Sequence, residues 1–192
     1  MTLLILGLIL FLGVHSVRVF ANDWRTAQIA QRGENAWKGI YSIASIAGFV
    51  LLVWGYGAAR QQPVVLWASP TWLRHVAALL MLLSFVLLVA AYVPRNAIKA
   101  RLHHPMVLGV KVWALAHLLA NNTLADLLLF GGFLAWSVLS YRAAKARDRA
   151  AGTVYAPGAP AGTLATAAIG TLAWAVFAFW AHRVLIGVGP FN

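Results

Sequence analysis

Long apolar segments separated by short polar runs are the dominant feature of this sequence of 192 residues. A helix that crosses a bilayer needs about 20 predominantly apolar residues. Six such stretches occur, at residues 2–20, 40–59, 73–93, 105–121, 124–141 and 164–183. Because 62% of the residues are hydrophobic and only 10% are charged, a soluble protein of this size could not bury its apolar surface. We therefore expect an all-α, polytopic integral membrane helix bundle with about six transmembrane helices, surrounded by the lipid bilayer.

One low-complexity segment, residues 150–162, is rich in glycine and proline. This composition predicts a loop rather than a domain boundary. We expect a single membrane domain over residues 1–192, in which a linker at 146–163 leads to a final helix at 164–183.

Basic residues gather in the segments that follow the first, third and fifth apolar stretches, which hold four, three and four of them. The segments on the other side hold only Arg60, Arg74 and Arg183. The positive-inside rule places the richer side in the cytoplasm, so both termini are expected on the opposite side. The net charge of +11 does not indicate nucleic-acid binding, because the basic residues lie in short runs between apolar segments.

The residue types present limit the metal chemistry that the chain can support. Cysteine is absent, which excludes disulfides, thiolate metal sites and cysteine nucleophiles. The four acidic residues, Asp23, Glu34, Asp126 and Asp148, lie at or outside the ends of the predicted spans, so a carboxylate-bridged di-iron site is not expected. The zinc motif His-Glu-x-x-His does not occur either. Histidine is the ligand type that remains.

Two histidines, His15 and His117, lie inside predicted spans, where ionisable side chains are costly and often functional. Each either makes an interhelical hydrogen bond or binds a haem iron as an axial ligand. His104 and His117 are about 220° apart around one helix, so they cannot bind the same iron. Lys111 either extends to the membrane surface or binds an anionic group such as a haem propionate. His75 lies at a predicted helix end and is expected at the interface.

Several short motifs resemble those of the NnrU family. They are LGVHSVR at residues 12–18, GIYS at 39–42, VWGY at 53–56, HPMVLG at 104–109, Trp113 and HLLAN at 117–121. The resemblance covers roughly residues 1–145, and the last helix is less characteristic. The family is similar to the plant and cyanobacterial zeta-carotene isomerase, a haem b membrane protein that isomerises a double bond in a polyene.

The resemblance implies haem b as the cofactor, with His15 and His117 as the ligands of its iron. His104 is the first substitute ligand and His75 the second, and we expect Lys111, Trp113 and Asn121 to contact the cofactor as well. A cysteine has been proposed as an alternative ligand in the isomerase. Ala114 occupies that position here, so a ligand switch through this thiol is not available to the chain.

The resemblance also implies a bacterial inner-membrane protein, with both termini in the periplasm, that is associated with denitrification and nitric oxide metabolism. We expect redox chemistry or ligand sensing at a bis-histidine haem, with nitric oxide or a redox protein as possible partners. One alternative is a haem-dependent isomerase of an apolar polyene, whose cavity wall would include Trp113, Phe130 and Phe133. The other alternative is a haem-free membrane scaffold or assembly factor.

Overall fold

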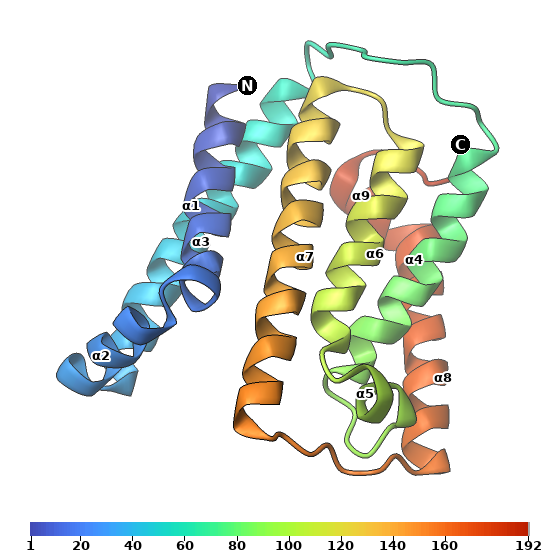
Figure 1. Cartoon of the computed structure of the whole chain (residues 1–192). Coiled ribbons are helices and arrows are strands. Elements are labelled where there is room, and N and C mark those ends of the chain that lie inside the picture. The colour runs from blue at the N-terminus through green and yellow to red at the C-terminus, as the bar shows by residue number, and fades with distance from the viewer. Residues whose placement is uncertain (192) are drawn as a thin grey trace.

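The computed structural model describes residues 1–191, which form a bundle of α-helices (Figure 1). The helices are α1 (Thr2–Phe20), α2 (Asn22–Arg32), α3 (Glu34–Ala59), α4 (Leu73–Ala90), α5 (Ala97–Leu102), α6 (Pro105–Ala120), α7 (Leu124–Ala151), α8 (Pro160–Val176) and α9 (His182–Ile186). A π-helical turn, η1 (Phe177–Ala181), joins α8 to α9. The prediction of an all-α membrane bundle is confirmed.

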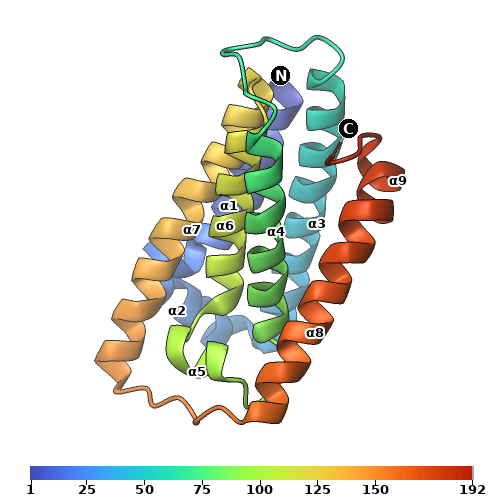
Figure 2. The same ribbon diagram turned by 90° about the vertical axis from the view of Figure 1, so that its right-hand side faces the viewer.

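The long helices do not pack in the order of the chain. The contacting pairs are α3 with α1, α1 with α7, α7 with α6, α6 with α4, and α4 with α8. The two termini lie toward the end of the bundle that also carries the 60–72 connection (Figures 1 and 2). The opposite end carries α2, α5 and residues 152–159, and we call it the basic end because eleven of the 15 Lys and Arg residues belong to this side.

Five of the six predicted spans are long and apolar enough to cross a membrane, namely α1, α3, α4, α7 and the continuous helix Pro160–Ile186. The sixth, α6, is apolar but has 16 residues. Its length is about 24 Å, which is shorter than the roughly 30 Å hydrocarbon core of a bilayer. It runs between α4 and α7, so its neighbours cover much of its surface (Figure 1).

Several helix boundaries differ from those predicted by apolar length. The helix α3 begins at Glu34 rather than at residue 40. In its first turn, Glu34 pairs with Lys38 at 2.9 Å. The helix α7 continues past residue 141 to Ala151, because alanine, lysine and arginine favour helix even where they are too polar for the bilayer. It ends at Gly152, whose φ of 60° is the left-handed conformation of a helix C-terminus. The linker predicted at 146–163 is therefore shorter and covers residues 152–159.

The helices α1 and α3 approach closely at glycines. A β-carbon on Gly7 would overlap the backbone of Leu52, and one on Gly55 would overlap the backbone of Leu4. At Gly48 it would lie 2.7 Å from the backbone nitrogen of Phe11. Small residues allow membrane helices to pack backbone against backbone in this way. This contact holds α1, which carries His15 and Arg18, in a fixed register against α3.

The cluster of buried hydrophobic residues lies next to this helix pair, toward the end opposite the basic end. Its buried residues are Leu4, Leu52, Ala59, Ala125, Leu129 and Phe130. The hydroxyl of Tyr56 on α3 donates a hydrogen bond to Asp126 Oδ1 on α7 at 2.5 Å. Asp126 also completes a capping box with Thr123 at the start of α7. The same carboxylate therefore begins α7 and ties it to α3.

Candidate functional site

A cavity of about 390 Å³ lies between α1, α6 and α7 near the basic end. Its polar lining residues are His15 and Arg18 of α1, His104 just before α6, Trp136, Ser140, Arg147 and Asp148 of α7, and Thr153 in the segment after α7. Trp136, Ser140 and Arg147 are separated by four and seven residues and therefore share one face of that helix, and Asp148 follows Arg147 directly. The cavity is in the size range of small-molecule sites.

His15 lies on one wall of this cavity with a fixed ring orientation. Its Nδ1 is 2.7 Å from the backbone carbonyl oxygen of Phe11, and its ring stacks on the Phe11 ring at a centroid distance of 4.2 Å. The rings of His15 and Trp136 meet edge to face, with 6.2 Å between their centroids. Because a carbonyl oxygen can only accept, Nδ1 carries the proton in the neutral ring, and the lone pair is on Nε2. Within residues 1–191, this Nε2 has no hydrogen-bond partner.

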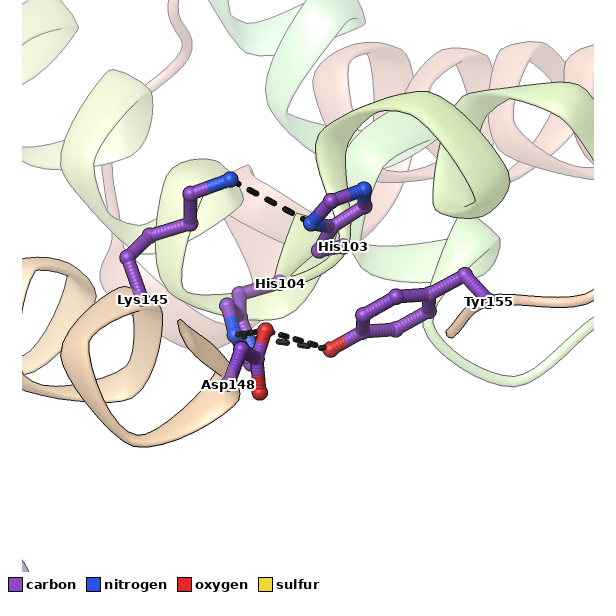
Figure 3. Close-up of polar contacts among 5 residues, drawn as sticks. All are labelled: His103, His104, Lys145, Asp148 and Tyr155. Carbon is purple, nitrogen blue, oxygen red and sulfur yellow. Dashed lines mark hydrogen bonds and ion pairs between the residues drawn. The ribbon is translucent and has the colours of Figure 1, made fainter. Parts of the chain in front are cut away.

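His104 lies on the other side of the cavity and belongs to a polar network (Figure 3). Its Nε2 is 2.7 Å from Asp148 Oδ2. The hydroxyl of Tyr155 donates to the same oxygen at 2.9 Å. The ring of Tyr155 stacks on His103 at 4.2 Å, and Lys145 Nζ lies 3.2 Å from His103 Nδ1. The network thus ties residues 152–159 to the end of α7 and to the start of α6.

Tyr155 remains a hydrogen-bond donor throughout the physiological range. Burial and the hydrogen bond to the Asp148 carboxylate raise the pKa of its hydroxyl to about 12. On the alkaline side, the contact between Tyr155 and the Asp148 carboxylate therefore weakens as the pH rises between about 10 and 12.

His117 lies in a different environment, near the other end of α6. Its Nδ1 is 2.9 Å from the carbonyl oxygen of Trp113, and its ring stacks on Phe130 at 4.6 Å. Trp113 meets Phe130 and Phe133 edge to face at 5.1 and 5.3 Å. Asn121 donates from Nδ2 to the carbonyl oxygen of His117 at 2.9 Å. Trp113 and Asn121, both predicted as site residues, therefore support His117 directly.

His15 and His117 are separated along the bundle. The ring of His15 meets Trp136, whereas the ring of His117 meets Phe130, six residues earlier on α7. At 1.5 Å per residue this is an offset of about 9 Å. The rings of Phe11 and Phe133, 5.8 Å apart, continue the contacts from His15 toward Trp113 and His117. The structure thus brings His15 and His104 to one cavity and connects His15 to His117 through aromatic rings.

Lys111 and His75 lie away from both histidine environments. The Lys111 side chain is exposed on α6, and His75 is exposed near the start of α4, at the end of the bundle opposite the basic end. Neither borders the cavity. Within residues 1–191, no group of three or more His, Cys, Asp or Glu side chains is placed to hold a metal ion.

The donor set of His15 and His117 fits the iron of a haem. In both rings Nδ1 is bound to a carbonyl oxygen four residues earlier and Nε2 is free. This hydrogen bond fixes the tautomer and the orientation in which imidazole binds a metal through Nε2. His104 differs, because its Nε2 is already engaged by Asp148. Among residues 1–191, His15 and His117 therefore combine a fixed Nδ1 with an Nε2 that has no hydrogen-bond partner.

The sequence prediction did not include Arg18, Ser140 and Arg147 of the cavity, or Tyr155 of the network around His104. Arg18 follows His15 by three residues on one helix, so helical spacing alone could have placed it on the same face. The pairing of His104 with Asp148, 44 residues later, has no signal in the sequence, because it depends on how α6 and α7 pack.

The long apolar helices define this chain as a polytopic α-helical membrane protein, and half-buried histidines lie between them. The sequence model of the family described as NnrU protein matches residues 3–190. The chain therefore belongs to the NnrU family, and the match includes the last helix, beyond the residues 1–145 expected from motifs. No curated protein and no solved structure matches the chain.

Proposed function

We propose that this protein binds haem b between its helices, with His15 and His117 as axial ligands and His104 as the substitute ligand. The observation that carries the proposal is the shared state of the two imidazoles, each with Nδ1 fixed on a carbonyl oxygen and Nε2 free. The chain offers no thiolate and few carboxylates, so imidazole is the strong iron ligand that it can supply.

The surroundings of the two histidines suit a redox or sensing role. When bound, haem b supplies one-electron redox chemistry and an iron that binds nitric oxide. Phe11, Trp113, Phe130 and Phe133 lie beside the two histidines or their ring neighbours and would exclude water from a bound haem, and a dry, apolar environment changes the redox potential. Two retained histidines favour electron transfer to a redox partner. Release of one histidine would open a position for nitric oxide.

His15 and His117 are offset by about 9 Å along the bundle, so the second ligand has two candidates, His117 and His104. His117 has the free Nε2, whereas His104 borders the same cavity as His15. Ligation by His104 would require its Nε2 to leave Asp148. We therefore favour His117, because its Nε2 is free to bind iron, and keep His104 as the substitute, because it lines the same cavity as His15.

Polyene isomerisation is less favoured by the packing. The aromatic residues that would form the wall of a polyene cavity instead contact one another, with Trp113 against Phe130 and Phe133. Ala114, at the position of the isomerase thiol, is fully buried with 0% exposure. These contacts support a role in redox chemistry or sensing, associated through the family with denitrification and nitric oxide metabolism.

We further propose that the chain lies in a bacterial inner membrane with its basic end in the cytoplasm and both termini in the periplasm. Eleven Lys and Arg residues belong to the basic side and three to the opposite side, and the positive-inside rule orients helices by this difference.

The test is the optical and electron paramagnetic resonance spectrum of the full-length protein, purified in detergent from cells supplied with haem. We expect a Soret band and a low-spin, six-coordinate signal. His15→Ala and His117→Ala should each reduce haem content or give a five-coordinate spectrum. His104→Ala should leave the spectrum unchanged if His117 is the ligand.

His182→Ala is the matched control, because His182 also has Nδ1 bound to a carbonyl oxygen, that of Val188 at 2.7 Å, but lies on α9. It should keep the parent spectrum. If His104→Ala abolishes haem binding while His117→Ala does not, the ligand pair is His15 and His104. If protein made with ample haem has no Soret band, the haem proposal is wrong and the scaffold function replaces it.

A further inference from the structure

Two residues that line the cavity near the basic end each have a buried side-chain polar atom that lacks a hydrogen-bond partner among residues 1–191. Among residues 1–191, Trp136 Nε1 and Ser140 Oγ are buried without a hydrogen bond. Both residues line the cavity, and Ser140 is only 7% exposed. A buried hydroxyl or indole N–H without a partner is unfavourable and uncommon in folded proteins. Because the indole N–H can only donate, it requires an acceptor from outside the chain.

Two arginines border the same space. Arg147 Nη1 donates to the carbonyl oxygen of Arg18 at 3.1 Å, which holds its guanidinium against the end of α1. A guanidinium has five N–H groups, so both arginines retain donors for a ligand. The nearby carboxylate of Asp148 accepts from His104 and Tyr155 through the same oxygen. The cavity therefore combines two cations, two unpaired polar groups and one carboxylate that already has partners.

We propose that this cavity binds a phosphate group through Arg18, Arg147, Trp136 and Ser140. All four offer donors, and a phosphate offers more acceptor oxygens than a carboxylate does. Guanidinium groups bind phosphate oxygens in pairs. The site goes beyond the proposed haem function, because none of these four residues is a proposed iron ligand. His15 lines the same cavity, so binding is compared at a recorded haem content.

The phosphate can come from two sources, an anionic phospholipid headgroup or free inorganic phosphate. The cavity volume of about 390 Å³ leaves space for more than a phosphate ion alone. Arg18 and Arg147 lie near the basic end, where α1 and α7 leave the apolar part of the bundle. Basic side chains at this depth attract anionic lipid headgroups.

The experiment measures ligand retention by native mass spectrometry of the full-length protein as purified in detergent, with haem content recorded in each sample. The lipid probe is phosphatidylglycerol, and a neutral glucosyl diacylglycerol with the same tails is the phosphate-free comparison. The free-anion probe is inorganic phosphate, and its binding is measured by the change in the apparent melting temperature of the protein. A phospholipid site retains phosphatidylglycerol and discriminates against the glycolipid, whereas a free-phosphate site is stabilised by millimolar phosphate and retains neither lipid.

Arg147→Gln and Ser140→Ala should each weaken retention of the phosphate-bearing probe, about tenfold for Arg147→Gln because it removes a charged donor. Arg142→Gln, an exposed arginine on the same helix that does not line the cavity, is the matched control and should bind as the parent does. Ser140→Ala should leave the melting temperature without added phosphate or lipid unchanged or higher, because it removes an unpaired hydroxyl.

Three results would overturn the proposal. The first is that neither probe binds the parent protein. The second is that Arg142→Gln weakens binding as much as Arg147→Gln does. The third is that Ser140→Ala destabilises the protein while binding stays unchanged. The last result would assign the hydroxyl a structural role. Haem content is a separate readout, so a failure of the haem proposal is distinguishable from a failure of the phosphate site.

Discussion

The substitution Gly55→Ala tests how tightly α1 is held against α3. An added β-carbon would lie 2.5 Å from the carbonyl carbon of Leu3 and 2.7 Å from the α-carbon of Leu4. Both are backbone atoms that cannot rotate aside. Ordinary contact at such a position begins near 3.4 Å, so α1 must move away by about 1 Å. A gap of that size forfeits a quarter to a half of the dispersion energy of the atoms involved.

The expected magnitude follows from comparison with Gly57→Ala. A β-carbon on Gly57 meets nothing within 4 Å, so this variant gains only the helix propensity of alanine, about 1 kcal/mol. Gly55→Ala has the same gain but adds overpacking, which costs about 1–3 kcal/mol. The free energies of unfolding should therefore differ by about 2 kcal/mol, which corresponds to roughly 4–8 °C in melting temperature for a chain of this length.

The measurement is thermal unfolding of both variants in the same detergent, followed by circular dichroism. Gly55→Ala should melt below the parent, and Gly57→Ala at or above it. Since α1 carries His15 and Arg18, haem retention should fall in Gly55→Ala as well. Equal melting temperatures for the two variants would refute the close approach of α1 and α3.

Three further predictions concern single side chains and the sidedness of the bundle. Tyr56→Phe removes the hydrogen bond to Asp126 and should lower stability by about 0.6–1.7 kcal/mol, as interhelical hydrogen bonds in membranes do; an unchanged unfolding curve would mean that this contact contributes nothing. Lys111→Leu should keep the haem content and the amount of protein in the membrane, because the side chain is exposed. Removing its charge also lowers the cost of inserting the helix by up to about 3 kcal/mol. Loss of haem at a normal amount of protein would instead place Lys111 in the site. In intact cells, an impermeant maleimide should label Gln62→Cys and leave Val154→Cys unlabelled, and the reverse pattern would invert the topology.

The fold class and most spans could be predicted because hydrophobicity is a local property. Each apolar stretch is long enough to be predicted as a span from its own residues, without knowledge of the helices that pack against it. Helix ends were less predictable, as α7 shows. Its segment from Arg142 to Ala151 is too polar to count as a span but is rich in helix-forming residues. The short apolar helix α6 was also predicted, although its length falls below that of a spanning helix.

The candidate ligands stay a prediction, which rests on the two histidines inside predicted spans and on the absence of cysteine. The sequence also specified that His104 and His117 face different directions on one helix. Their hydrogen-bonding states were not predictable. The free Nε2 of His117 and the engaged Nε2 of His104 depend on which groups pack against each ring.

By itself, the sequence determined that this chain is a membrane helix bundle of the NnrU family with histidine as its available iron ligand. Only the tertiary structure decided which helices are neighbours, and so placed His15 of α1 beside Trp136 of α7, more than 100 residues away. In a bilayer the hydrophobic effect does not choose between apolar helix faces, so the order of helices is set by packing of small residues and by a few interhelical polar contacts. These contacts involve backbone shape and distant residues together, and no local pattern in the sequence records them.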